Sequence, residues 1–346
     1  MKKKVFIKKK FLFYCILIIS LFLIIFILAE VSLRILGHKP ASPKYRLNIK
    51  VEPSGKYFKK DSLLGYTHLP GKFYVTLNNN YTFVTTHKNN TLRITHPIAD
   101  DSYYIDKAKI WIMGCSFTHG WSINDDETYP WLIQEMYKDN YEIINFGCSG
   151  YGTIHSLIQI EEALKIIEKP KIIIYTYSSI HDHRNTFLLK RRKSVTRWNF
   201  LGPLSQPYAT YNKKEGLQIY KADTIEYKGL PFNNYFALIN FIEKVYLYFE
   251  DKFANDHDVS KALILKINEI CKKNEIMFIL AGIDSYNLSE TQEMIDFCKS
   301  LDIYAVDISV DHNIPGTMNL PHDGHPSPTA NKKYAKKLSD YLNSLK

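Results

Sequence analysis

The sequence predicts an α/β protein, preceded by a membrane-spanning helix and a small β-rich lobe. Two observations lead to this prediction. From residue 109 onward, short apolar runs alternate with longer helix-like stretches, a rhythm typical of parallel strands linked by crossover helices. Near the N-terminus, residues 11–29 carry no charge and consist mainly of Ile, Leu and Phe. We therefore expect a parallel sheet covered on both faces, held near a membrane.

The apolar stretch is long enough to cross a bilayer, which takes roughly 20 residues. A cleaved signal peptide is the alternative, but it has a shorter apolar run and a small-residue cleavage site. We favour an uncleaved anchor over residues 11–36. Lysines crowd residues 1–10, so this tail is expected in the cytoplasm and the rest of the chain on the outer, periplasmic or extracellular side.

The formal net charge of +10 does not point to a nucleic-acid partner. Six lysines fall within the first ten residues, and without them the remaining chain carries only +4. A charge of that size is unremarkable for a soluble domain. The expected partners are the membrane and an acylated small-molecule or glycan substrate, and the sequence leaves the oligomeric state open.

Residues 38–108 are expected to form the β-rich lobe. The segments 73–77 and 81–86 are dense in aromatic and β-branched residues, and three asparagines at 78–80 separate them. This pattern predicts a β-hairpin.

Residues 109–346 are expected to form the α/β domain. The predicted strands are 109–113, 142–146, 171–176, 276–281 and 304–307, and the predicted helices are 129–138, 153–167, 260–273, 289–300 and 328–344. Residues 186–258 break the rhythm with strand-like pieces at 218–220 and 224–227 and an apolar helix near 240–249. We expect this insertion to cap the site.

The heptapeptide Gly-Cys-Ser-Phe-Thr-His-Gly, residues 114–120, directly follows the first predicted strand. A serine among small residues on such a turn exposes its hydroxyl beside backbone N–H donors, as a nucleophile requires. Ser116 is therefore the candidate nucleophile. His325 is the candidate base, and Asp323 is placed to orient it; a plain surface turn is the alternative for Asp323-Gly324-His325-Pro326.

Four polar segments follow predicted strands and should meet at one sheet edge, because sites in parallel sheets lie at the carboxyl ends of the strands. They are Ser116, residues 147–152, residues 181–183 and residues 323–325. The N–H groups of Ser116 and Gly150 are the expected oxyanion donors, since the glycines around Gly150 permit close backbone approach.

Three segments resemble the conserved blocks of the SGNH/GDSL hydrolase superfamily. They are Gly114-Cys115-Ser116-Phe117-Thr118, residues 145–152 and Asp323-Gly324-His325-Pro326. The resemblance covers residues 109–185 and 260–345, and the lobe resembles the leader of membrane-anchored bacterial members. It implies a flavodoxin-like three-layer α/β/α sandwich, a Ser-His-Asp triad, and an oxyanion hole built from the serine N–H, a glycine N–H and an asparagine side chain.

The chain departs from that pattern in three places. Cys115 replaces an aspartate next to the nucleophile, and the Asp323–His325 spacing is one residue shorter than the commonest form. His181 stands where the family has its asparagine. An imidazole N–H can donate to an oxyanion, so we expect His181 to be the third donor; a solvated loop residue is the alternative. His119 and His155 are expected to be structural or to contact substrate.

The remaining cysteines and histidines predict neither a cofactor nor a metal. A disulfide between Cys115 and Cys148 is permitted outside the cytoplasm, but buried thiols are favoured. A metal site is supported only by expected proximity, and its candidate ligands are His181, Asp182, His183, His322 and His325.

The sequence thus predicts a membrane-anchored serine esterase or O-acyltransferase that works through an acyl-serine. The resemblance implies O-acyl groups of envelope or exported glycans as its substrates. The alternative is a non-catalytic envelope protein that binds a glycan or a partner through a degenerate domain of this type.

Overall fold

The computed structural model describes residues 2–42, 48–223, 229–284 and 288–345. The chain divides into two compact units, one formed by Met1–Arg46 and Glu226–Ala254, the other by Leu47–Ile225 and Asn255–Lys346. Each is described by itself. The domain boundaries expected from the sequence remain a prediction.

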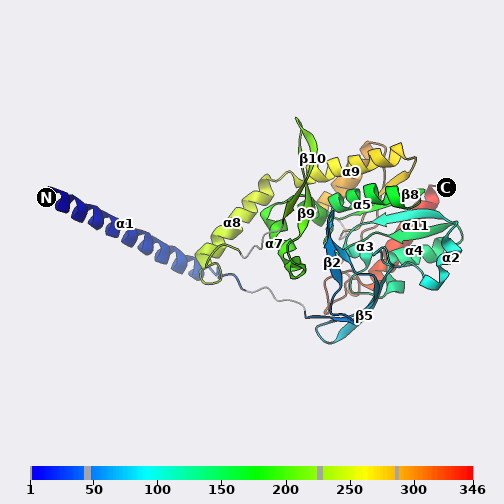
Figure 1. The fold of residues 1–346 in the computed structure, drawn as a ribbon, viewed down its shortest axis with the longest axis horizontal. Helices are drawn as coiled ribbons and strands as arrows, with labels where there is room; N and C mark the ends of the chain where they lie inside the picture. The colour runs from blue at the N-terminus through cyan, green and yellow to red at the C-terminus, as the bar shows by residue number, and fades with distance from the viewer. Residues whose placement is uncertain (1, 43–47, 224–228, 285–287, 346) are drawn as a thin grey trace. The chain divides into compact units, whose positions relative to one another are not determined.

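The larger unit is built on a parallel five-stranded sheet (Figure 1). Its strands lie in the order β12-β11-β8-β6-β7, and every neighbouring pair is parallel. Their bounds are β6 Ala108–Met113, β7 Tyr141–Asn145, β8 Ile172–Tyr177, β11 Met277–Gly282 and β12 Tyr304–Asp307. Numbered along the chain, this is the 2-1-3-4-5 order of flavodoxin-like folds. The predicted fold class is confirmed, and each predicted strand is present within one or two residues.

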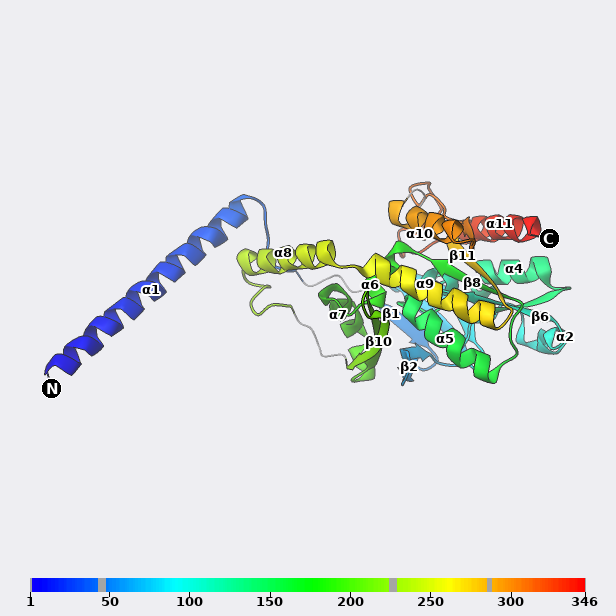
Figure 2. The ribbon, with the colours of Figure 1, turned by 90° about the horizontal axis from the view of Figure 1, so that it is seen from above.

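Helices cover both faces of this sheet, and Figure 2 shows α5 beside α9. The helices are α4 Tyr129–Tyr137, α5 Thr153–Ile166, α9 Asp256–Lys273, α10 Ser289–Ser300 and α11 Pro328–Ser344. Alternate strand residues feed two cores. Trp111 of β6 packs with α5, α9 and α10, whereas its neighbour Ile112 packs with α4 and α11. This alternation is what a strand buried on both faces requires.

The β-rich lobe belongs to the same unit. Its strands are β1 Ile49–Glu52, β2 Phe58–Asp61, β3 Gly65–His68, β4 Gly71–Leu77 and β5 Tyr81–His87. The predicted hairpin is β4 paired antiparallel with β5, and β1 joins its free edge. The sequence did not reveal β1, β2 and β3, which are only four residues long.

A buried arginine ties the lobe to the sheet. Arg93 forms isolated β-bridges to His87 and to Asn145 of β7. Its guanidinium pairs with Asp125 at 2.9 Å and donates to the carbonyl oxygens of His119 and Gly120. An arginine without solvent exposure is tolerable only when its donors are satisfied in this way.

Shorter elements complete the unit. They are α2 Asp101–Tyr104, α3 Ser116–His119, α6 Asp182–Asn185, α7 Leu189–Val195, β9 Ser205–Asn212, β10 Gly216–Asp223 and the 3₁₀ turns Ile98–Asp100, Asp125–Glu127, Ser179–His181 and Thr196–Leu201. β9 and β10 form an antiparallel pair within the predicted insertion. The strand-like piece expected at 224–227 lies outside the described residues.

The smaller unit contains α1 Lys2–Ile35 and α8 Ala237–Phe253. From Lys10 to Ile35, α1 is long and apolar enough to cross a membrane. The Glu30 carboxylate accepts hydrogen bonds from the backbone N–H groups of Ala237 and Leu238 at 2.9 and 2.8 Å. It thereby caps the N-terminus of α8, where N–H groups have no partner within the helix.

Candidate active site

Ser116 lies where β6 ends and begins the one-turn helix α3. In the turn before Ser116, position 114 has no room for a side chain, because a Cβ there would collide with the hydroxyls of Thr118 and Thr176. A Cβ on Gly147 would likewise collide with the backbone N of His119, so the loop after β7 packs directly on α3. At the other end, Gly120 ends the helix with a φ of +83°, which favours glycine.

The structure brings the three predicted triad residues together. His325 Nε2 lies 3.0 Å from Ser116 Oγ, and His325 Nδ1 lies 2.5 Å from Asp323 Oδ1. These are hydrogen-bond distances, and the second is charge-assisted. The base therefore contacts the nucleophile with one ring nitrogen and its orienting carboxylate with the other, as acyl transfer by a serine requires.

The charge of Asp323 is stabilised from two sides. Trp121 Nε1 donates to its second oxygen, Oδ2, at 2.6 Å. Burial alone raises the pKa of Asp323, but the hydrogen bonds from His325 and Trp121 and the interaction with the His325 charge outweigh burial, and the pKa lies below its usual value. The carboxylate is thus kept ionised beside the base. Sequence reasoning missed Trp121, because a single tryptophan belongs to no recognisable motif.

The His325 loop is held against the N-terminal half of the chain. The Asn319 side chain donates to the Ser122 carbonyl at 2.8 Å, and its backbone N–H donates to the His325 carbonyl at 2.9 Å. The ring of His322 stacks on Tyr81 with centroids 4.5 Å apart. Immediately after the loop, Ser327 caps α11 by accepting from the Ala330 N–H. Lobe, α3 and α11 together define where His325 sits.

Gly150 lies in the loop after β7 with a φ of +83°. Arg191 donates to its carbonyl oxygen at 3.0 Å. The arginine is buried and so holds this peptide in place. The expected role of the Gly150 N–H as an oxyanion donor remains a prediction.

His181 is fully buried rather than solvated. Its Nδ1 lies 2.8 Å from the Tyr175 hydroxyl, and its ring packs edge-on against Tyr177. Burial and the Arg184 charge lower its pKa well below the usual value, so the ring is neutral. Within the described residues its Nε2 is buried without a hydrogen-bond partner. Only that atom is left to donate to a ligand, and only in the tautomer that carries its proton there.

Asp182 and His183, two of the candidate metal ligands, have separate partners. The Asp182 carboxylate accepts from the Tyr177 hydroxyl at 2.8 Å and pairs with His257 Nδ1 at 2.8 Å. Burial lowers the pKa of His257, but its hydrogen bond to Asp182 and the negative charges of Asp182 and Glu293 together outweigh burial, and the pKa is raised. His183 pairs with Asp256 at 2.7 Å. These contacts fasten the turn after β8 to α9.

The four cysteines outside α1, at positions 115, 148, 271 and 298, are buried free thiols. Burial raises the pKa of Cys271 and of Cys298 to about 12. Burial also raises that of Cys148. The thiols of Cys148, Cys271 and Cys298 therefore pack as apolar groups rather than react. His155 is buried as well, and its ring stacks on Tyr151 with centroids 4.5 Å apart.

No protein-family model and no curated protein sequence matches the chain. Solved structures do match it. A protein assigned to the lipolytic G-D-S-L family from Desulfitobacterium hafniense DCB-2 aligns at a TM-score of 0.40 and 14% identity, over 68% of this chain and 100% of its own. The psychrotrophic esterase EstA from Pseudoalteromonas sp. aligns at 0.39 and 11%, over 69% and 98%. A carbohydrate acetylesterase family member from Sinorhizobium meliloti aligns at 0.38 and 9%, over 68% and 98%.

The chain is thus similar to solved structures of the SGNH/GDSL type that its motifs resemble.

Proposed function

We propose that the protein is a serine esterase or O-acyltransferase that works through an acyl-enzyme on Ser116. One observation carries the proposal. Ser116 Oγ, His325 and Asp323 form a continuous hydrogen-bonded chain with distances of 3.0 and 2.5 Å. The three residues span more than 200 positions, and a half-buried histidine held by a buried carboxylate and aimed at a serine hydroxyl is the arrangement that activates a serine nucleophile.

The mechanism follows from the protons. Ser116 Oγ attacks an ester carbonyl while His325 Nε2 accepts the hydroxyl proton, and the ionised Asp323 stabilises the imidazolium that forms. His325 then returns the proton to the leaving alcohol. The tetrahedral oxyanion is bound by the N–H groups of Ser116 and Gly150 and by His181 Nε2–H. Loss of one such donor should raise the activation free energy by about 2.7–4 kcal/mol. Water or a sugar hydroxyl finally releases the acyl group from Ser116.

We place this activity on the outer side of a membrane, with α1 as an uncleaved anchor. The length and apolar character of α1 support the anchor, and the lysines at 2–4 and 8–10 support a cytoplasmic N-terminus. An anchored enzyme facing outward would meet O-acyl groups of envelope or exported glycans. Retention in the membrane pellet after alkaline extraction tests the anchor, and a cleaved, soluble form would contradict it.

The decisive experiment compares Ser116→Ala with Ser156→Ala on short acyl esters. Ser156 is a matched control, because it is also buried and its Oγ has no partner within the described residues. We expect Ser116→Ala to lose at least about 10³-fold in kcat and Ser156→Ala to keep wild-type activity.

A fluorophosphonate probe provides a second, substrate-independent measurement. It should label the wild type and Ser156→Ala at Ser116 and leave Ser116→Ala unlabelled. A wild type that is neither labelled nor active on any ester would refute the enzyme and favour a non-catalytic binding module.

A further inference from the structure

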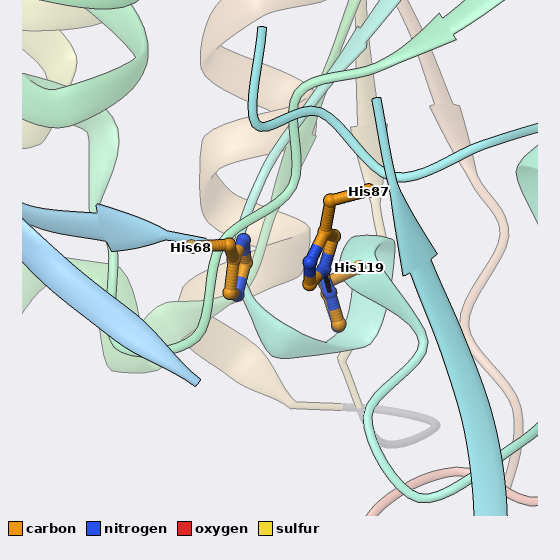
Figure 3. Close-up of side chains that lie close together, drawn as sticks. All are labelled: His68, His87 and His119. Carbon is orange, nitrogen blue, oxygen red and sulfur yellow. Dashed lines mark hydrogen bonds between the residues drawn. The ribbon is translucent and has the colours of Figure 1, made fainter. Parts of the chain in front are cut away.

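Three histidines from separate elements meet in the interior of the larger unit. His68 ends β3, His87 ends β5 and His119 ends α3. All three are buried, with at most 2% of each residue exposed. Each can offer one ring nitrogen, and these three nitrogens lie within 4.8 Å of one another. Figure 3 shows the rings gathered in one place, with His87 and His119 in contact.

The cluster is in the chemical form that metals bind. Burial lowers the pKa of His87 to about 3. Burial also lowers the pKa values of His68 and His119 well below their usual value, and the neighbouring histidine of the cluster adds to the effect. The rings are therefore neutral and keep a lone pair for coordination. The cluster calls for a physical account, because within the described residues His119 Nδ1 is buried without a hydrogen-bond partner, and such burial is costly.

Two of the rings already have the geometry of ligands. His87 Nδ1 donates to the Leu69 carbonyl at 2.9 Å, so its lone pair is on Nε2. That backbone contact is the usual outer partner of a metal-bound histidine. His87 Nε2 lies 3.0 Å from His119 Nε2, and the Tyr57 hydroxyl lies 3.4 and 3.3 Å from the same two nitrogens. A tetrahedral cation with bonds of about 2.0–2.1 Å holds its ligand atoms about 3.3 Å apart.

The third ring has to turn. His68 stacks on His87 with centroids 4.4 Å apart and planes 11° apart, and a metal lies in the plane of each imidazole that binds it. The polar contact of His68 Nε2 is the Cys148 thiol at 3.8 Å. A thiol is a weak hydrogen-bonding partner, so a rotation of the ring gives up little.

We propose that His68, His87 and His119 bind one borderline transition-metal cation, with Zn²⁺ as the expected occupant and Tyr57 beside its fourth position. An all-imidazole set suits zinc, cobalt, nickel or copper and does not suit Mg²⁺ or Ca²⁺, which take oxygen ligands. Because two ligands come from lobe strands and the third from the helix that begins at Ser116, the cation would clamp the lobe onto α3. This site is independent of the proposed esterase activity and is expected even if that activity fails.

The rival arrangement is a hydrogen bond from His119 Nε2–H to His87 Nε2 with no metal. Cobalt titration separates the two. Tag-free full-length protein in detergent, stripped with a chelator, should bind one Co²⁺ per chain with the intense visible absorption of a tetrahedral site. Zn²⁺ should displace the Co²⁺ and raise the Tm. No stoichiometric uptake and an unchanged Tm would overturn the proposal.

Variants locate the site. His87→Gln should abolish the cobalt spectrum and the Zn²⁺-dependent rise in Tm, whereas His155→Gln, a buried histidine outside the cluster, should keep both. If His87→Gln does not fold, X-ray absorption spectroscopy at the zinc edge of the zinc-loaded wild type tests the ligand set instead. A first shell of about three nitrogens near 2.0 Å supports the site, and a shell dominated by sulfur or water oxygens contradicts it.

Discussion

At the scale of single residues, Trp121 is the least expected participant in the candidate site. Its backbone N–H donates to the Ser116 carbonyl oxygen at 3.0 Å, and its indole N–H donates to the orienting carboxylate at Asp323 Oδ2. A hydrogen bond to a charged group contributes about 1.5–3 kcal/mol. In the proposed mechanism Trp121 therefore acts as a positioning residue that keeps Asp323 ionised and aimed at His325.

Trp121→Phe should lower kcat about 10-fold, which corresponds to about 1.4 kcal/mol, and leave KM nearly unchanged. The phenyl ring keeps the edge contacts that the indole makes with Tyr57 and Phe83, so the fold should persist. Without this donor the pKa of Asp323 rises, and the acidic limb of the kcat profile should move to higher pH. Steady-state kinetics across pH measure both effects.

Trp131→Phe is the matched control for this prediction. Trp131 Nε1 donates at 3.0 Å to Glu135, a surface carboxylate remote from the triad. The control should behave as wild type. Equal kcat and an equal acidic limb in both variants would remove Trp121 from the mechanism.

At the scale of elements, α4 and α11 both begin with a hydroxyl side chain as the N-cap, but only the cap of α11 directly follows the His325 loop. Ser327 Oγ accepts from the Ala330 N–H and donates to the Gly316 carbonyl at the start of α11. Thr128 Oγ accepts from the Trp131 N–H and donates to the Asp125 carbonyl at the start of α4. Each cap is expected to contribute about 1 kcal/mol to folding.

Ser327→Ala and Thr128→Ala should therefore lower the free energy of unfolding by similar amounts, about 1 kcal/mol each. Only Ser327→Ala should also lower kcat, because this cap lies two residues after His325 and fixes the direction in which the His325 loop enters α11. Thermal unfolding and ester hydrolysis, run on both variants, test this. A kcat that falls in both, or in neither, would show that the cap does not position the base.

How far the sequence could predict these elements depended on their length. The apolar runs of the five sheet strands and the periodicity of α4, α5, α9, α10 and α11 extend over enough residues to be recognised. The helix α3 has a single turn and therefore no period, and β1, β2 and β3 are too short for alternation to show. The triad was predictable because parallel strands bring their carboxyl ends to one edge.

Other parts of the site depend on packing that no local pattern encodes. His68, His87 and His119 come from two strands and a helix, and their meeting follows only from how the lobe packs on α3. The burial of His181 between Tyr175 and Tyr177 follows likewise from the path of the turn after β8. Sequence reasoning therefore predicted that the candidate triad meets at the strand ends, and it missed the residues that support this site from the lobe.

At the scale of the whole molecule, buried neutral histidines should dominate the response to acid. Five of them have pKa values lowered chiefly by burial: His68, His87, His119, His155 and His181. An unfolded chain protonates its histidines near pH 6.5. The folded state does not bind these protons in the same pH range, because the pKa values of its buried rings are lowered. The free energy of unfolding is therefore highest above about pH 6.5 and falls as the pH drops below that value.

The metal-free protein should consequently lose stability steeply between about pH 6.5 and pH 5, by up to about 1.4 kcal/mol per pH unit for each such histidine. Denaturant unfolding at several pH values measures the slope. His155→Gln should reduce that slope by up to about 1.4 kcal/mol per pH unit, the contribution of one histidine, independently of its effect on stability at neutral pH. A stability that stays flat over this range would contradict the assignment of these rings as neutral.

The hydrogen bonds around Asp323 also have a consequence for the second half of the proposed reaction. From Ser116 the path runs through His325 and Asp323 to Trp121, and the backbone from Trp121 leads back through α3 to Ser116. The path is a closed loop, and its link at the serine is the one that an acyl group on Oγ would replace. When an acyl group occupies Oγ, that link opens, yet His325 stays tethered from its far side. The base is then still in place to activate the incoming water or alcohol.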